Sequence, residues 1–421
     1  MRNDWVQTTV GDLLRAKGGS IKTGPFGTVL KANEYSTDGV PVISVGEIGY
    51  GSFRLHQSTP RVPPAVLARL PEYVLKAGDI VFGRKGAVDR SALIRNSEEG
   101  WFLGSDGIRL RLPDECDPFF FAYQLQNPAT RAWLLQHATG TTMASLNQGV
   151  IERIPIVVPP LFEQREMAGI LRPLDEKLDL NRSMNQTLEA MAQTLFRSWF
   201  VDFDPVRAKA EGRQPERMDA ETAALFPNRF VESVLGTAPE GWAIQRLGDI
   251  LELKRGYDLP SSQRVLGAVP VISSSGASGW HNEPKIPGPG IVTGRYGSIG
   301  EVFLVREAFW PLNTTLYVRD LKRNNLIYAY HLLRLLDFNK FSDKAAVPGI
   351  NRNHLHEERL VAAPRTLQER FADLASPLLE LAAKNTAQTT TLAALRDTLL
   401  PKLLSGKIRI RDVKAQLAAT A

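Results

Sequence analysis

The sequence predicts an α+β protein with a pseudo-twofold internal repeat, in which a mixed α/β module occurs twice and a long helix follows each copy. Three observations lead to this fold class. Short sequence words recur in the same order along the 421 residues. In both halves, short β-branched runs alternate with Gly- and Pro-rich turns, as in compact domains with short strands. Apolar residues at coiled-coil spacing then follow each copy.

The repeat is seen most clearly in the word VPVIS, which stands at 40–44 and again at 269–273. Neighbouring words match in the same order: WVQTTVGDLL with WAIQRLGDIL, and IVFGRKGAV with IVTGRYGSI. The offset between matching words falls from 237 to 204 and then stays constant. Because shorter loops in the second copy would shrink the offset in this way, we interpret the halves as one module present twice.

A long helix is predicted after each module, beginning behind the strand-like words IVVPP and LVAAP. In the first helix the a and d positions are Met167, Ile170, Leu174, Lys177, Asn181, Met184, Leu188, Met191 and Leu195. In the second they are Leu367, Phe371, Leu374, Leu378, Leu381, Asn385, Gln388, Leu392, Leu395 and Leu399. This spacing predicts two coiled-coil helices. Pro173 and Pro377 occupy matching positions, where each helix is expected to kink or restart.

The middle of each coiled-coil seam is polar. Asn181 lies there in the first helix, and Asn385 and Gln388 lie there in the second. Since the centres of two antiparallel helices lie opposite each other, we predict that Asn181 faces the Asn385–Gln388 step and determines the register. The alternative is that these residues form hydrated gaps in a loose seam.

These patterns divide the chain into six segments. A charged stretch punctuated by Pro and Gly separates the first helix from the second copy and is interpreted as a linker. The expected boundaries are a first module at 1–160, a helix at 161–203, a linker at 204–240, a second module at 241–364, a helix at 365–405 and a tail at 406–421.

Composition restricts the class of protein. Cys116 is the single cysteine, so the chain forms no internal disulfide and no cysteine-based zinc cluster. We find no apolar run near the roughly 20 residues that span a bilayer, and no signal-peptide pattern at the start. We therefore expect a cytoplasmic protein without a membrane segment. The net charge of +6 is compatible with a polyanionic partner without requiring one.

Motifs that resemble catalytic or cofactor sites fail on spacing. In GSIKTGPFGT, Pro25 stands where a phosphate-binding P-loop requires Lys. VFGRKG and VTGRYG lack the third glycine and the helix of a dinucleotide-binding turn. His354 and His356 are not spaced as a zinc-binding pair on a helix. The sequence therefore favours a binding or assembly protein without catalysis and without a metal.

Three stretches resemble the specificity subunit of type I restriction-modification systems: KTGPFGTVLKANEY at 22–35, TLFRSWFVDFDPV at 194–206 and LRDTLLPKLLSGKIRI at 395–410. The layout of two modules, each followed by a long helix, is similar as well. The resemblance implies two target recognition domains, each of which reads one half of a split DNA site. It also implies that the two helices pack antiparallel, set the spacer between the half-sites and recruit the methyltransferase subunits.

The resemblance further implies a non-catalytic subunit whose partners are double-stranded DNA, two methyltransferase subunits and restriction/translocase subunits. No cofactor is expected in this chain itself. The complex is expected to methylate adenine with S-adenosylmethionine and, with restriction subunits, to cleave DNA in a reaction that needs ATP and Mg²⁺. Two alternatives from other classes are a stand-alone DNA-modifying enzyme and a coiled-coil scaffold that does not bind DNA.

Candidate DNA-binding residues occur at matching places in the two modules. The turns with Arg84 and Lys85, and with Arg295 and Tyr296, carry a glycine on each side that permits close approach to a phosphate or base edge. Weaker candidates are Lys22 and Thr23 in the first copy, and Lys254 and Arg255 in the second. The alternative for each cation is a solvated position in a surface loop.

The aromatic cluster FRSWF at 196–200 has two interpretations. The first, which we favour, is that this helix end buries itself beneath its own domain. The second is a partner-binding surface, formed by what stays exposed of Trp199, Phe200 and Phe203, that helps to dock the methyltransferase subunit.

Overall fold

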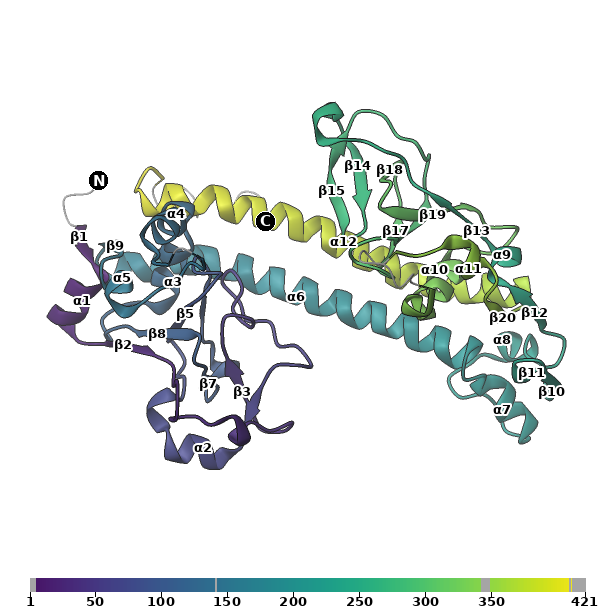
Figure 1. Ribbon diagram of the computed structural model, residues 1–421, viewed down its shortest axis with the longest axis horizontal. Coiled ribbons are helices and arrows are strands. Elements are labelled where there is room, and N and C mark those ends of the chain that lie inside the picture. The colour runs from purple at the N-terminus through teal and green to yellow at the C-terminus, as the bar shows by residue number, and fades with distance from the viewer. Residues whose placement is uncertain (1–4, 141, 342–348, 409, 411–421) are drawn as a thin grey trace. The chain divides into compact units, whose positions relative to one another are not determined.

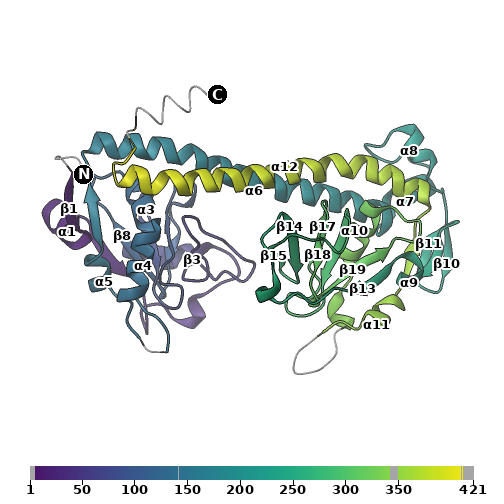
Figure 2. The same ribbon diagram turned by 90° about the horizontal axis from the view of Figure 1, so that it is seen from above.

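The computed structural model describes residues 5–140, 142–341, 349–408 and 410, which divide into two compact units (Figure 1). The first unit takes its residues from 1–180 and 388–421, and the second from 181–387. Each unit contains one module and one segment of each long helix, α6 (Leu161–Phe200) and α12 (Arg365–Leu404). Figure 2 shows the strands of each unit on one side of its helix segments.

The first module is built on a four-stranded antiparallel sheet of order β2-β8-β5-β6, with a three-stranded sheet β4-β3-β7 and a ribbon β1-β9. Its strands are β1 (Val6–Thr9), β2 (Ser20–Thr23), β3 (Val40–Ile43), β4 (Arg61–Val62), β5 (Ile80–Gly83), β6 (Ser91–Leu93), β7 (Phe102–Leu103), β8 (Gly107–Arg111) and β9 (Pro155–Val158). Its helices are α1 (Val10–Lys17), α2 (Pro64–Arg69), α3 (Pro118–Gln126), α4 (Pro128–His137) and α5 (Gln148–Glu152).

The second module repeats this plan, with sheets β13-β19-β16-β17 and β15-β14-β18 and a ribbon β12-β20. Its strands are β12 (Ala243–Arg246), β13 (Glu252–Arg255), β14 (Val269–Ser273), β15 (Gly276–His281), β16 (Gly290–Gly294), β17 (Val302–Val305), β18 (Trp310–Pro311), β19 (Thr315–Asp320) and β20 (Arg359–Ala362). Its helices are α9 (Leu247–Ile250), α10 (Leu326–Leu335) and α11 (Arg352–His356).

The repeated word VPVIS forms the same element in both modules. It builds β3 in the first and β14 in the second, and each strand runs parallel to a two-residue strand, with Val42 beside Phe102 and Val271 beside Trp310. In both strands the three residues from the proline onward are buried, as expected for a β-branched run enclosed by other elements. The predicted α+β fold with two similar modules is therefore confirmed.

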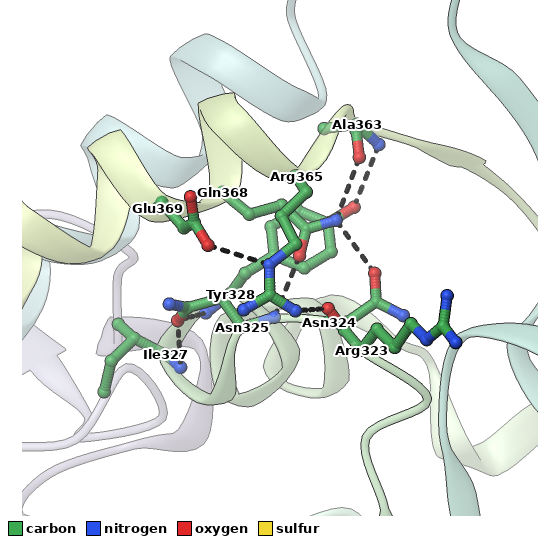
Figure 3. Close-up of polar contacts among 9 residues, drawn as sticks. All are labelled: Arg323, Asn324, Asn325, Ile327, Tyr328, Ala363, Arg365, Gln368 and Glu369. Atoms are coloured by element: carbon green, nitrogen blue, oxygen red, sulfur yellow. Dashed lines mark hydrogen bonds and ion pairs between the residues drawn. The ribbon is translucent and has the colours of Figure 1, made fainter.

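A buried glutamine joins each module to its long helix. In the second unit, the Gln368 side chain of α12 accepts a hydrogen bond from the Asn325 N–H at 3.0 Å (Figure 3). Its amide nitrogen donates to the Ala363 carbonyl at 2.9 Å and to the Asn324 side chain at 2.8 Å. Because these groups lie away from water, each bond satisfies a polar group whose burial would otherwise destabilise the unit.

Gln164 makes the corresponding contacts in the first unit. It accepts from the Asp117 N–H at 2.9 Å and donates to the Pro159 carbonyl at 2.8 Å. Both Gln164 and Gln368 stand at the fourth residue of their helices and are nearly inaccessible to solvent. Each module is thus fastened to its helix by two equivalent hydrogen bonds, and Gln368 makes a third, to Asn324.

Within the second unit the two helices run antiparallel. Near one end Phe196 of α6 stacks edge-to-face on Phe371 of α12, with ring centroids 5.3 Å apart. Farther along, the Asn181 amide donates to the Asn385 carbonyl at 3.4 Å, and the Asn385 amide donates to the Asn185 side chain at 3.0 Å. Asn181 therefore lies against Asn385, while Gln388 belongs to the first unit. A role in register stays a prediction.

The seam between the helices differs in part from the predicted a/d frame. Met191, Leu374 and Leu381 are exposed, and so is Leu395 in the first unit. In the second unit the alanines next to the predicted positions are buried instead, at Ala192, Ala375 and Ala382. The heptad assignment was wrong here because small side chains let a helix approach its neighbours closely and leave the larger leucines outside. The expected restart is also absent, since each helix is continuous through its proline, Pro173 in α6 and Pro377 in α12.

The aromatic end of α6 is part of the core of the second unit. Trp199 and Phe200 are 3% and 6% exposed, and Phe203 is 9% exposed. Their rings contact those of Phe371, Tyr328, Phe226, Phe230 and Trp242. The favoured interpretation, burial of this helix end, is therefore confirmed, within the second unit. The second interpretation is corrected, because burial leaves these three side chains little surface with which to contact a partner.

The segment expected to be a linker is folded into the second unit. It forms α7 (Asp204–Ala210), α8 (Ala220–Ala224) and a hairpin of β10 (Phe230–Ser233) and β11 (Gly236–Pro239). Val206 and Phe226 lie in the core of the unit. Asp219 caps α8 and forms an ion pair with Arg370 of α12 at 3.0 Å, and the hydrogen bonds from Thr222 hold the pKa of its carboxyl low. Of the tail, only residues 406–408 and 410 are described.

Candidate nucleic-acid interface

In the second module, the turn after β16 carries two predicted DNA-binding residues. A side chain at Gly294 would place its Cβ 1.9 Å from the Ser298 carbonyl oxygen, so only glycine permits this turn. The backbone N–H groups of Arg295 and Tyr296 both donate to the Thr314 carbonyl, at 2.9 and 3.2 Å. The turn is therefore closely packed, and the Arg295 side chain extends from a rigid base.

Strand β13 brings two more predicted residues to the same place. β13 and β16 flank the central strand β19, where Lys254 and Val292 are both register partners of Tyr317. The end of β13 therefore lies near the turn after β16. Together they line a groove of about 390 Å³ whose polar residues include Lys254, Arg255, Arg295, Tyr296 and Arg352. The structure thus brings together all four residues predicted in this module and adds a fourth cation.

Two of the four cations of the groove are oriented by backbone carbonyls. Arg255 Nε donates to the Asn313 carbonyl and Arg295 Nε to the Ile350 carbonyl, each at 3.4 Å. The Arg295 guanidinium also lies 4.5 Å from the centroid of the Tyr296 ring. None of the four, Lys254 and Arg352 included, forms an ion pair with a carboxylate in the part of the chain that the structure describes. The groove is therefore a positive site suited to a polyanion.

Two tyrosines lie close to Lys254 of this groove, Tyr257 beside its side chain and Tyr317 as its register partner. Tyr257 follows β13, and its ring lies 5.6 Å from Lys254 Nζ. Its hydroxyl is 3.0 Å from that of Tyr317 on β19. This hydrogen bond lowers the pKa of Tyr257, whereas burial raises the pKa of Tyr317. The pair forms a polar edge that links the end of β13 to the central strand.

The corresponding turn of the first module follows β5 and carries Arg84 and Lys85. Arg84 donates to the Ser105 carbonyl at 3.2 Å, and its guanidinium lies 5.5 Å from the centroid of the Phe26 ring, which is 62% exposed. Lys85 Nζ lies 3.2 Å from an Asp106 carboxylate oxygen. Both predicted residues are thus at the surface, and each has an intramolecular partner.

Lys22 and Thr23 end strand β2, which lies beside β8 as β5 does. Lys22 Nζ lies 3.8 Å from the Glu72 carboxylate and 4.6 Å from the centroid of the Tyr73 ring. The Thr23 hydroxyl accepts a hydrogen bond from the Gln148 amide at 3.1 Å. Since Thr23 and Phe82 are both register partners of Ile108, the structure brings these residues to the same end of the sheet as the Arg84 turn.

Arg352, Gln148 and Phe26 also belong to these surfaces, although they were not predicted. Arg352 and Gln148 each follow an asparagine that caps a short helix, and they stand at the constant offset of 204, which was the signal that could have identified them. His356 is structural, since its Nε2 accepts from the Leu253 N–H at 2.9 Å and burial lowers its pKa.

The described residues show no metal-binding cluster and no reactive cysteine beside these surfaces. Among the described residues, no group of three or more His, Cys, Asp or Glu side chains could hold a metal ion. Cys116 is buried, and burial raises the pKa of its thiol to about 11, which keeps it protonated near neutral pH. Within the described parts of the chain, no helix is both long and apolar enough to span a bilayer.

Comparison with known proteins identifies the family. Residues 2–190 and 239–385 match the family described as "Type I restriction modification DNA specificity domain". The chain is 22% identical to the type I restriction enzyme HindI specificity subunit of Haemophilus influenzae, over 96% of this chain and 100% of the relative. It is 23% identical to the MjaIX specificity subunit of Methanocaldococcus jannaschii, over 97% and 95%.

A solved structure supports the same fold. The type I restriction-modification system S subunit from M. genitalium superposes with a TM-score of 0.57 at 17% identity, covering 96% of this chain and 97% of that one. The two matched stretches coincide with the two halves of the internal repeat and together cover most of the sequence. The chain therefore belongs to the type I restriction-modification DNA specificity family, as a specificity subunit that contains the family domain twice.

Proposed function

We propose that each module reads one half of a bipartite DNA site for a type I restriction-modification complex. The observation that carries this proposal is a basic, glycine-flanked turn at the same place in both modules, after β5 and after β16. Arginine in such a turn can contact a phosphate or fork onto a guanine edge. Because the two turns and their neighbours differ in sequence, the two half-sites are expected to differ as well.

In this proposal the two long helices set the number of unread base pairs and recruit the methyltransferase subunits. Each helix has 40 residues, and a helix of that length extends about 60 Å. Helices of fixed length make a suitable spacer, since readers with two DNA-binding modules contact half-sites at a defined separation. Membership of the specificity-subunit family supports this role.

The chain contributes sequence choice and no catalysis of its own. The methyltransferase subunits, two per complex, supply adenine methylation from S-adenosylmethionine, and restriction/translocase subunits supply cleavage that needs ATP and Mg²⁺. The relatives are named specificity subunits of type I restriction enzymes, which supports these partners. The complex would act in the cytoplasm, where it meets DNA.

Mapping methylated adenines in cells that express the chain with its methyltransferase subunits tests the proposal. We expect one motif with two different specified halves and an unspecified spacer of constant length. A continuous motif would contradict the bipartite reading. Methylation of DNA by the purified chain alone would identify the chain as an enzyme. If the chain did not bind DNA, the alternative of a coiled-coil scaffold would be favoured. Binding that weakens steeply with salt distinguishes a DNA reader from a scaffold.

Lengthening α6 and α12 by one turn each at matching positions tests the spacer role. We expect the unspecified spacer to become longer while both specified halves stay unchanged, because the modules themselves are intact. The measurement is the same methylation map, with an equally long insertion in an exposed loop of one module as the control. Altered half-site identity with an unchanged spacer would show that the helices do not set the separation.

A further inference from the structure

We infer that the two modules hold DNA by different physical means: the second supplies most of the phosphate contacts, and the first relies on neutral and aromatic contacts. This inference deepens the proposed function and rests on it. It follows from comparing residues at equivalent positions in two modules of the same topology. The proposed ligand of the second groove is the phosphate backbone of duplex DNA.

The equivalence of positions follows from strand register. Lys22 is the partner of Arg109 on β8, and Lys254 is the partner of Tyr317 on β19, where β8 and β19 are the second strands of their sheets. Arg84 directly follows β5, and Arg295 directly follows β16. In the same way Gln148 and Arg352 are the first residues of α5 and α11, whose capping asparagines correspond.

In the second module these positions present free positive charge. Lys254, Arg255, Arg295 and Arg352 line one groove, and no described carboxylate lies within ion-pair distance of any of them. Asp258 is close in sequence, but its carboxylate accepts a hydrogen bond from the Asn313 amide at 2.7 Å. A phosphate entering this groove would meet cations that have no intramolecular ion pair to break.

In the first module most of the equivalent positions, Arg84 excepted, are neutralised or neutral. Lys22 is paired with Glu72 at 3.8 Å, and Lys85 with Asp106 at 3.2 Å. The position of Arg352 is occupied by Gln148, and that of Arg255 by Thr23, and these two side chains bond to each other. The surface therefore presents little unpaired charge at these positions.

Arg84 is the exception among these positions, because it forms no ion pair within the described residues and an exposed ring lies beside it. Its guanidinium rests near the Phe26 ring and bonds to the Ser105 carbonyl, which leaves it half-buried. A side chain at Gly24 would place its Cβ 1.8 Å from the Gly104 carbonyl oxygen, so the loop that carries Phe26 packs closely on its neighbour. An exposed aromatic ring on such a loop can contact a thymine methyl or a base face.

The distinction has a measurable consequence. Each phosphate contact made by a cation releases counterions and contributes about 0.9 to the slope of log K against log salt. A lysine already paired with a carboxylate contributes less, because the carboxylate repels the phosphate or the pair must first separate. The slope should therefore depend mainly on the second module.

Salt-dependent binding of duplex DNA by the full-length chain tests the inference. The double variant Lys254→Gln with Arg352→Gln should lower the slope by about 2 and weaken binding roughly 10- to 100-fold at moderate salt. The comparison variant in the first module, which removes the two ion-paired lysines by Lys22→Gln with Lys85→Gln, should lower the slope by less than about 1. Unchanged thermal unfolding of both variants shows that the effects are not losses of folding.

A reciprocal variant gives the opposite expectation. Glu72→Gln with Asp106→Asn removes the paired carboxylates and leaves Lys22 and Lys85 free, so it should raise the slope by about 1 to 2 and tighten binding at low salt. Two outcomes would overturn the inference. One is an equal decrease of the salt slope in the double variants of the first and the second module. The other is no increase of the slope in the variant that lacks the two carboxylates.

The outcome is distinguishable from failure of the proposed function. If the two double variants differ in slope on mixed-sequence duplexes as expected, but the wild-type complex methylates no bipartite motif, the proposed function fails and the phosphate groove stands. If the bipartite motif is found and the slopes of the two double variants are equal, the division between modules fails and the proposed function stands.

Discussion

His331 is a buried histidine without a hydrogen-bond partner in the second unit. Neither ring nitrogen is bonded within the described residues, and the side chain is 1% exposed among the rings of Phe196, Tyr330 and Phe371. Burial lowers its pKa from 6.5 to about 3, so the imidazole is neutral in the folded protein at ordinary pH. The unfolded chain, in contrast, takes up a proton near pH 6.5.

The stability of the second unit is therefore expected to fall in acid. Between pH 6.5 and about 3 the unfolded state binds one more proton than the folded state at His331, so the free energy of unfolding decreases as pH falls. The contribution of this group is at most about 1.4 kcal/mol per pH unit. Urea unfolding between pH 7.5 and 5 measures it. We expect His331→Gln to reduce the pH dependence, and His354→Gln, at an exposed position, to leave it unchanged.

The first module offers a reason for choosing glutamine. Gln124, on helix α3, occupies the corresponding place, and its amide exchanges two hydrogen bonds of 2.8 Å with the Val157 backbone. A glutamine at 331 is uncharged and has no proton to gain as the pH falls. An unchanged pH dependence in the variant would show that other groups, such as His356, determine the acid response.

At the scale of elements, the asparagine contacts between α6 and α12 combine burial with hydrogen bonding. Asn181 is fully buried and Asn385 is 7% exposed, while Asn185 bonds both Asn385 and Thr386 at 3.0 Å. Such a layer costs stability relative to leucine, but it disfavours other registers, in which an amide would face apolar side chains. The predicted role of these asparagines in register therefore depends on the cost of the registers in which their amides are not hydrogen-bonded.

Replacing Asn181 and Asn385 with leucine together should raise the stability of the second unit and loosen its register. Spin labels at the exposed positions Gln186 and Glu380 would report the distance between the helices. Cys116 is buried with a raised thiol pKa, so it should not compete for the label. We expect a narrow distance distribution in the labelled wild type and a broader or shifted one in the variant. An unchanged distribution would exclude the register role.

At the scale of the whole molecule, the first unit is discontinuous in sequence. Its core combines Met167 and Ile170 of α6 with Leu400 and Leu403 of α12, more than two hundred residues later. Arg396 of α12 also donates to Asp175 of α6 at 2.9 Å, in a largely buried pair. The first unit is thus completed only when the last turns of α12 have been synthesised.

Truncating Leu403 to alanine should therefore destabilise the first unit by about 2–4 kcal/mol, because the side chain is 1% exposed. Hydrogen exchange resolves the two units, so we expect faster exchange in β5 and β8 and unchanged exchange in β16 and β19. Leu395→Ala is the matched control, since that side chain in the same helix segment is 37% exposed and should cost much less. Equal losses in both units would show that they unfold together.

Much of the fold could be predicted from the sequence because local patterns carry it. VPVIS predicts a buried strand wherever it occurs, and it forms β3 and β14. The glycines around Arg84 and Arg295 predicted tight turns, and Cβ atoms at Gly83 and Gly294 would indeed clash with backbone carbonyls. The buried face of the two long helices was predicted only in part. It depends on the module and the neighbouring helix that pack against each helix, and the heptad spacing does not contain this information.

The sequence by itself determined that one module is present twice, that a long helix follows each copy, and that basic turns occupy matching places. These features depend on residues close together in the chain, so periodicity and turn chemistry reveal them. Only the tertiary structure decided that Arg352 joins Lys254 in one groove, while Glu72 and Asp106 neutralise Lys22 and Lys85 in the other module. Most of these charges come from separate elements, and their pairing depends on distances that exist only after the strands between them have assembled.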